Sequence, residues 1–273
     1  MTTSQNHDPF YSKTGDLIFS NQLGVKIEMD TVSNDDYYAW LDDMIGSVGS
    51  MVPGAEIAEK PDARVSPSLH TAIYYDTPDF RILPTGALLR ATCNRFGHAY
   101  CTFKAPADSQ HIRRDQRYVF DGHDKAVMQR APDSAEAVAI VRKLLVRTDI
   151  EQPGAMLRAE YGIDPGSLEP AIRLDDHRYT YFAWLDGRDA LRCSIDRFEV
   201  TSLRLPAAKR ERSWLGEAEL SVYPRIDPAT AGDPRVRQLM DKLADSLCER
   251  FGVSQTSLIK YQRAARSLHV SQW

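Results

Sequence analysis

Several segments of this chain alternate apolar with charged residues, a period of two that places successive side chains on opposite faces of a β-strand. In the first segment, residues 23–30, four apolar residues form one face and Lys26, Glu28 and Asp30 form the other. The charged face carries both signs. A chain that repeats this pattern is expected to build a sheet with one apolar face and one charged face.

The same pattern predicts eight strands, most of them joined as hairpins. Helix-like stretches separate them at 34–48, where Asn34 is the expected N-cap, at 134–146, and at 233–251 before Gly252. Residues 49–67 and 204–214 are expected to be loops. The expected strands lie near residues 23–30, 69–76, 88–95, 100–104, 113–120, 172–183, 190–197 and 217–222.

An antiparallel sheet of eight strands can close on itself, and its charged faces then line the interior. We therefore predict an α+β fold built on a closed eight-stranded antiparallel β-barrel with flanking helices. The alternative for each single strand is an ordinary sheet with one face in the core and one in water.

Charge and hydropathy exclude some partners. The chain has 273 residues, with 38 acidic and 34 basic side chains and a net charge of -4, so no nucleic-acid partner is expected. No apolar run approaches the ~18 residues that span a bilayer, and the first residues do not resemble a signal peptide. We expect a cytoplasmic protein without a membrane partner. The sequence does not indicate an oligomeric state.

The cysteines are expected to be reduced. Cys93, Cys101, Cys193 and Cys248 form no C-x-x-C pair, and three of them lie on apolar strand faces. A Cys93–Cys101 bridge across a hairpin is the alternative. The histidines do not have zinc-ligand spacing.

Charges of both signs inside a barrel favour one class of ligand. Lysine and arginine donors suit a polyanion with several phosphoryl groups. Carboxylates would repel such a ligand unless they hold a hard divalent cation that bridges them to phosphate oxygens. The sequence therefore predicts a metal-bound polyphosphate and phosphoryl-transfer chemistry.

Two stretches carry a family resemblance. Residues 74–93, YYDTPDFRILPTGALLRATC, and residues 100–106, YCTFKAP, resemble the CYTH superfamily of triphosphate tunnel metalloenzymes. The match is strongest over 74–106. It implies an eight-stranded antiparallel tunnel, Mg²⁺ or Mn²⁺ as cofactor, and a substrate with a triphosphate or longer polyphosphate. It also implies one tunnel domain at 22–268, between tails at 1–21 and 269–273.

The family motifs match this chain unevenly. The first-strand motif E-x-E-x-K appears as Lys26-x-Glu28-x-Asp30, and the leading basic residue resembles the polyphosphate-polymerase branch. Arg90 matches the first arginine of L-R-x-R, whereas Thr92 replaces the second. Further matches are Lys104 of T-x-K, Arg113 with Asp115, Arg192 with Asp196, Glu217 with Glu219, and Lys260 with Tyr261 of an S-K-Y motif.

The resemblance suggests roles for these residues. Asp30, Asp115 and Asp196 would orient water or hold a basic neighbour, whereas Glu28 would carry metal with Glu217 and Glu219. Arg173 and Arg178 have opposite parity, so one of them faces the interior, and Arg173 is the predicted one. Asp76 is expected to be a turn residue that binds backbone amides. The expected phosphate ligands are Lys26, Arg90, Lys104, Arg113, Arg173, Arg192 and Lys260; the expected metal ligands are Glu28, Glu217 and Glu219; the expected catalytic residues are Glu28, Asp30, Asp115 and Asp196.

The predicted function is metal-dependent hydrolysis of inorganic triphosphate or an organic triphosphate. Adenylate cyclisation, thiamine-triphosphate hydrolysis and polyphosphate synthesis are other activities that the family resemblance allows. A non-catalytic member that binds polyphosphate or a nucleotide is the alternative from another class, because Asp30 and Thr92 reduce the positive charge of the interior. A structural barrel that binds no anion is a third option.

Overall fold

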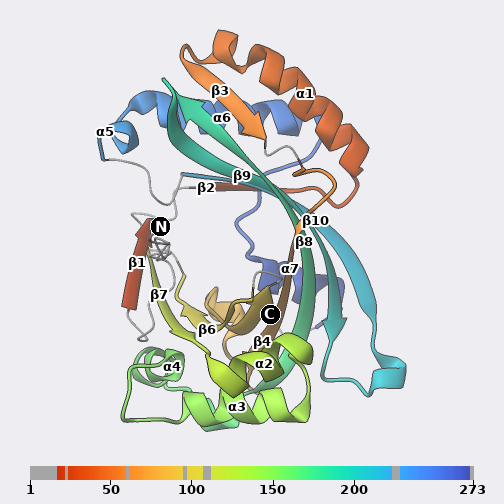
Figure 1. The fold of residues 1–273 in the computed structure, drawn as a ribbon. Helices are drawn as coiled ribbons and strands as arrows, with labels where there is room; N and C mark the ends of the chain where they lie inside the picture. The colour runs from red at the N-terminus through yellow and green to blue at the C-terminus, as the bar shows by residue number, and fades with distance from the viewer. Residues whose placement is uncertain are drawn as a thin grey trace, which may run out of the picture.

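The computed structural model describes residues 17–21, 24–59, 62–94, 97–106, 112–222 and 228–270. Within them the chain has an α+β fold with one large antiparallel sheet, and strands run around a ring in Figure 1. The described strands are β1 (Leu17–Asn21), β2 (Gly24–Glu28), β3 (Ala55–Glu59), β4 (Ser68–Asp76), β5 (Leu88–Asn94), β6 (Ala99–Lys104), β7 (Ile112–Val119), β8 (Glu169–Leu185), β9 (Arg188–Ser202) and β10 (Arg212–Val222).

All eight expected strands are present, and the described residues add β1 and β3. β1 lies in the segment expected to be a tail, and β3 lies in the expected loop 49–67. β10 begins at Arg212, within the expected loop 204–214. The strand order is β1-β7-β6-β5-β4-β8-β9-β10-β2, and β3 pairs with β8 beside this path.

Closure of the barrel, which the sequence predicts, is not seen as strand pairing in the described residues. The order ends at β1 on one side and at β2 on the other, and the described parts of these two strands do not pair with each other. The segment after helix α6 (Pro234–Phe251) occupies the free edge of β2. Glu28 N donates to Ser254 O at 3.2 Å, and Thr256 N donates to Lys26 O at 2.8 Å. This segment therefore satisfies backbone groups that a closing strand would otherwise use.

Helices cover the outer face of the sheet in two groups (Figure 1). Helices α1 and α6 pack with β2, β9 and β10, and helices α2, α3 and α4 pack over β5 and β6. The three expected helices are present as α1, α3 and α6, although Ser33 rather than Asn34 is the N-cap of α1, since its hydroxyl accepts from Asp36 N. The helices are α1 (Asn34–Met51), α2 (Gly122–Arg130), α3 (Ala135–Leu145), α4 (Pro153–Tyr161), α5 (Pro228–Ala231), α6 (Pro234–Phe251) and α7 (Lys260–Ser267).

Helix α7 differs from the others because it packs on the opposite, inner face of the sheet. Its apolar side chains form a cluster with inner-face residues of β4, β8 and β9, including Tyr74 and Phe198. Tyr261 stacks on Tyr74 with a centroid distance of 4.7 Å and an interplanar angle of 8°. The helix thus fills one part of the space that the sheet surrounds and brings its polar side chains to the charged faces of the strands.

The corner after β4 holds α7 in place. Asp76 is fully buried, and its carboxylate accepts hydrogen bonds from the amides of Thr77, Ile82 and Leu83 at 2.8–3.0 Å. This confirms the prediction that Asp76 is a turn residue. Tyr261 OH also donates to Asp76 Oδ2 at 2.9 Å, so a buried hydrogen bond joins the corner to α7.

The cysteines are all free thiols, as predicted, and no Cys93–Cys101 bridge is formed. Cys93, Cys101 and Cys193 are buried in the two outer-face cores. In the part of the chain that the structure describes, no helix is both long enough and apolar enough to cross a membrane.

Candidate active site

The charged side chains meet on the inner face of the sheet, because residues paired across antiparallel strands lie on the same face. Register places Glu28 opposite Glu217, Glu217 opposite Asp196, and Asp196 opposite Arg178, in one row across four strands. Lys26 and Glu219 pair in the next row. Among the side chains that the structure describes, the strands place these charged residues on this face: Lys26, Glu28, Arg90, Lys104, Asp115, Arg117, Asp176, Arg178, Arg192, Asp196, Glu217 and Glu219.

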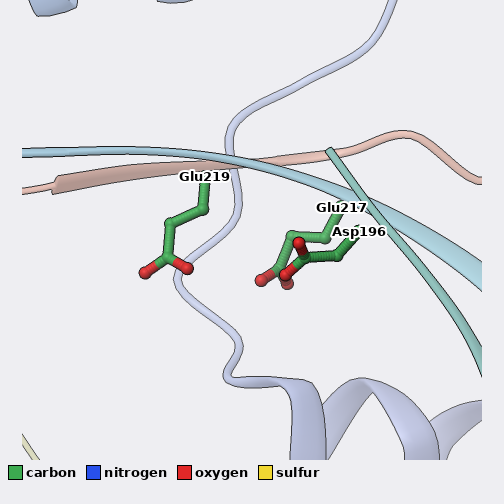
Figure 2. Close-up of side chains that lie close together, drawn as sticks. All are labelled: Asp196, Glu217 and Glu219. Atoms are coloured by element: carbon green, nitrogen blue, oxygen red, sulfur yellow. The ribbon is translucent and has the colours of Figure 1, made fainter. Parts of the chain in front are cut away.

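Three carboxylates of β9 and β10 form a compact acidic group, defined here as Asp196, Glu217 and Glu219 (Figure 2). Each offers an oxygen within 4.8 Å of the others. Oε1 of the buried Glu217 has no hydrogen-bond partner among the described residues. Carboxylate oxygens are the preferred ligands of Mg²⁺ and similar hard cations. The acidic group therefore fits a divalent metal ion.

Burial and neighbouring cations set different ionisation preferences in the acidic group. Burial raises the pKa of Glu217 above its usual value, although Lys26 and Lys260 oppose this. Burial also disfavours ionised Glu219, but Lys26, Arg178 and Arg192 lower the pKa of Glu219 to about 2. Glu217 is thus the member whose negative charge would gain most from an added cation.

Asp196 is held by two cations from different parts of the chain. Arg178 donates to Oδ1 at 2.9 Å and to Oδ2 at 2.6 Å, and Lys260 of α7 also donates to Oδ2. Burial opposes ionisation of Asp196, yet Arg178 and Lys260 hold the pKa of Asp196 well below its usual range. These bonds leave about one of the roughly four lone-pair positions of the carboxylate for another partner.

Lys260 also joins Asp176 to the site, since its Nζ donates to Asp176 Oδ2 at 2.9 Å. Its ammonium group lies 4.9 Å from the centroid of the Phe198 ring. Burial would lower the pKa of Lys260, but Asp176 and Asp196 raise it, so the side chain stays charged. Asp176 is 6% exposed, and its Oδ1 has no partner in the described residues.

A second part of the inner face carries buried donors. Arg90 lies on β5 opposite Tyr74 on one side and Thr102 on the other. Arg90 Nε and the hydroxyls of Thr92 and Thr102 are buried and have no partner among the described residues. Buried polar atoms are normally hydrogen-bonded. An anion with several oxygens would satisfy all three of these groups.

The structure corrects the choice between Arg173 and Arg178. Arg173 pairs across the sheet with Ile73, on the outer face, and bonds to Asp175 and Asp133. Arg178 pairs with Asp196 on the inner face. The prediction that Arg173 faces the interior is wrong, because the register of β8 against β9 places Arg178 on the inner face. Since β8 has no bulge between the two arginines, Arg173 lies on the opposite face.

The other predicted residues lie on or beside the inner face. Lys104 pairs with Asp115 at 2.7 Å, and half-buried Arg192 lies on β9 opposite Ser221. The side chain of Arg113 lies outside the described residues. Glu28 is absent from the acidic group, and its two oxygens accept from Arg266 at 3.0 Å.

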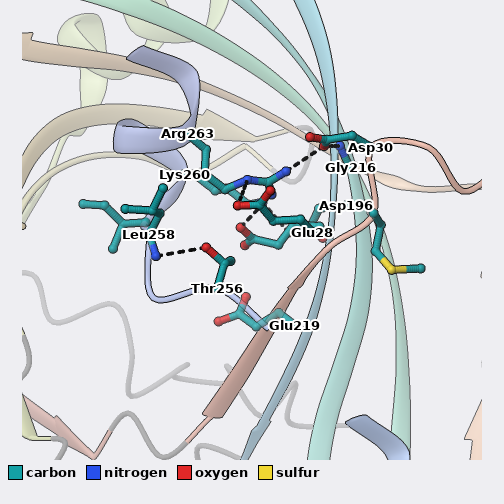
Figure 3. Close-up of polar contacts among 12 residues, drawn as sticks. Glu28, Asp30, Asp196, Gly216, Glu219, Thr256, Leu258, Lys260 and Arg263 are labelled. Atoms are coloured by element: carbon teal, nitrogen blue, oxygen red, sulfur yellow. Dashed lines mark hydrogen bonds and ion pairs between the residues drawn. The ribbon is translucent and has the colours of Figure 1, made fainter. Parts of the chain in front are cut away.

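Asp30 lies just beyond β2 and holds a basic neighbour, as one of its two predicted roles requires. Asp30 Oδ1 accepts from Arg263 at 2.6 Å and from Gly216 N at 2.7 Å (Figure 3). A Cβ at position 216 would lie 2.5 Å from Met29 O. Glycine therefore permits the close approach of the two chain segments that brings Asp30 next to Glu217.

Asp176, Arg178 and Arg263 are among the site residues that were not selected from the sequence. Asp176 has the right parity for an inner-face position, but the long run 172–183 gave no reason to prefer it. Arg263 is 1% exposed and donates to Glu217 Oε2 at 3.2 Å as well as to Asp30. Its i, i+3 spacing from Lys260 and Arg266 on α7 is the signal that could have identified it.

The sequence matches no protein-family profile and no curated protein. Solved structures do resemble the fold. A candidate adenylate cyclase from Bacillus halodurans has a TM-score of 0.51 and 12% identity, over 90% of this chain and 97% of that chain. A candidate adenylyl cyclase from Hippeastrum, described as having a dominant triphosphatase activity, has a TM-score of 0.50 and 11% identity, over 92% of this chain and 98% of that chain.

At these identities the likeness concerns the fold. The chain shares the fold of these two proteins, and this agrees with the fold that the resemblance of residues 74–106 implies. The comparisons do not distinguish the polyphosphate-polymerase branch from the others.

Proposed function

We propose that this protein hydrolyses a short polyphosphate, either inorganic triphosphate or an organic triphosphate, with Mg²⁺ or Mn²⁺. One observation carries the proposal: the inner face places the acidic group beside Lys26, Arg178, Arg192 and Lys260. A polyphosphate with a divalent cation has the complementary arrangement of charge.

The acidic group would hold the metal ion. Such an ion neutralises phosphate oxygens and lowers the pKa of an attacking water. Among the predicted metal ligands, Glu217 and Glu219 belong to the group, and Asp196 takes the place expected for Glu28. Substrate phosphates would compete for Arg178 and Lys260, and this competition would free an Asp196 oxygen for the metal.

Basic residues of the inner face would bind the phosphate chain. Arg90, Thr92 and Thr102 offer buried donors, and Lys26, Arg178 and Arg192 lie near the acidic group. Thr92 thus supplies a hydroxyl where the family pattern has an arginine. Asp176 Oδ1 has no partner among the described residues and would accept a proton from the attacking water.

A second function, polyphosphate binding without turnover, is favoured by a separate observation. Lys104, Arg178 and Lys260 are each paired with a carboxylate in the structure. Cations engaged in this way are less available to a transition state. The Hippeastrum protein of similar fold is described as having a dominant triphosphatase activity, and this supports hydrolysis as the first choice.

Phosphate release decides between the two functions. With Mg²⁺ or Mn²⁺, the protein is expected to release phosphate from tripolyphosphate or ATP, and chelation with EDTA is expected to lower the rate by about 10³-fold, because the metal supplies several kcal/mol of transition-state stabilisation. Restoring the metal should restore the rate. Tight tripolyphosphate binding without phosphate release under any of these conditions would establish the binding function instead.

A further inference from the structure

Helix α7 presents three cations on one face, because Lys260, Arg263 and Arg266 are spaced three residues apart. Figure 3 shows Lys260 and Arg263 directed from the helix toward carboxylates of the sheet and of the turn after β2. Lys260 serves Asp176 and Asp196, as described above. Arg263 and Arg266 pair with a different set of acidic residues.

The arginines engage the acidic residues in and just after the first-strand motif. Arg266 Nη2 donates to both oxygens of Glu28 at 3.0 Å. Arg263 donates to Asp30 Oδ1 at 2.6 Å and lies 3.6 Å from Glu28 Oε1. Burial opposes ionisation of Glu28, but Arg263, Thr256 and Arg266 lower the pKa of this carboxyl below its usual value.

These contacts determine where cations can bind. Lys260 already holds Asp176, the carboxylate next to Asp196 on the β8 side. On the β2 side, a second divalent ion beside the acidic group would need carboxylate oxygens from Glu28 or Asp30. Both are already neutralised by guanidinium groups, and an incoming ion would be repelled by those same groups. Arg263 is 1% exposed, so it cannot turn into solvent without leaving an oxygen of the buried Glu217 unpaired.

We propose that the protein binds a single divalent ion, at Asp196, Glu217 and Glu219, and that Arg263 and Arg266 stand where a second ion would otherwise bind. This inference rests on the proposed function for the location of the ion. Arg263 contributes a fixed positive charge beside Glu217, and a guanidinium can neutralise developing phosphate charge as a metal ion does.

Counting bound Mn²⁺ by electron paramagnetic resonance, without any phosphate compound, tests the proposal. The unmodified chain is expected to bind one ion. Glu28→Gln should still bind one ion with an affinity within about fivefold, because Glu28 is paired with a surface arginine rather than the metal. Glu219→Gln should lose about 10- to 100-fold or more in affinity.

Arg266→Gln should bind a second ion more weakly than the first, because it removes the arginine bonded to both oxygens of Glu28 while Arg263 stays 3.6 Å from Oε1. Arg237→Gln is a matched control, since Arg237 is 55% exposed and bonds both oxygens of Asp241, whereas Arg266 is 54% exposed. This control should bind one ion. Two ions on the unmodified chain, an equal loss of affinity in Glu28→Gln and Glu219→Gln, or one ion on Arg266→Gln would each overturn the proposal.

Phosphate release tests the proposed hydrolase function separately from the number of bound ions. One bound ion without turnover would overturn the hydrolase function and support this inference. Turnover with two bound ions would support the hydrolase function and overturn this inference.

Discussion

Replacing Glu217 by glutamine is expected to lower phosphate release from tripolyphosphate by about 10³-fold, because it removes one negative metal ligand from the acidic group. Glu217 is fully buried, and its Oε1 has no hydrogen-bond partner among the described residues. The amide keeps the shape of the side chain and an acceptor for Arg263. The rate with Mn²⁺ is the measurement, and the thermal unfolding midpoint reports whether the variant is folded.

Glu199→Gln is the matched control for this variant. Glu199 lies on β9, pairs in register with Trp214 of β10, and bonds to Arg212 rather than to the acidic group. Its replacement should leave the rate within about threefold, as for a surface ion pair. A Glu217→Gln protein that is folded and as active as the Glu199→Gln protein would contradict the assignment of Glu217 as a metal ligand.

Replacing Asp76 by alanine is expected to destabilise the protein by roughly 3–5 kcal/mol. The change removes a carboxylate that accepts from three amides and from Tyr261 OH. Those donors are buried and would keep no partner there. Urea unfolding followed by circular dichroism measures the free energy of unfolding.

Asp79→Ala serves as the control for the corner. Asp79 is a neighbouring aspartate that accepts from Thr77 Oγ1 at the exposed side of the same corner. Its unfolding midpoint should stay close to that of the unmodified chain. If Asp76→Ala unfolds at the same urea concentration as Asp79→Ala, the corner does not stabilise the contact with α7 as described.

Much of the sheet could be predicted because alternation is a local property of sequence. The alternation alone predicts that Lys26, Glu28 and Arg90 lie on the inner face. β3 was missed because Ala55–Glu59 is short and lies in a stretch rich in glycine, proline and serine. The sequence pattern did not predict helices α2 and α4 either, since each has only nine residues.

The partners of the charged residues could not be predicted in the same way, because they depend on non-local pairing. Parity shows that Arg173 and Arg178 face opposite sides, but the register of β8 against β9 decides which one meets Asp196. Glu28 and Arg266 are 238 residues apart in sequence. No local pattern indicates that α7 would return to the first strand and place Arg266 on Glu28.

The most direct test of the central claim is the position of Mn²⁺ in crystals soaked with Mn²⁺ and tripolyphosphate, located by its anomalous diffraction. We predict an anomalous peak in contact with Asp196, Glu217 and Glu219, with phosphate oxygens beside Arg178 and Lys260. A peak bound by Glu28 and Asp30 instead, or phosphate on the inner face with no metal at the acidic group, would contradict the account.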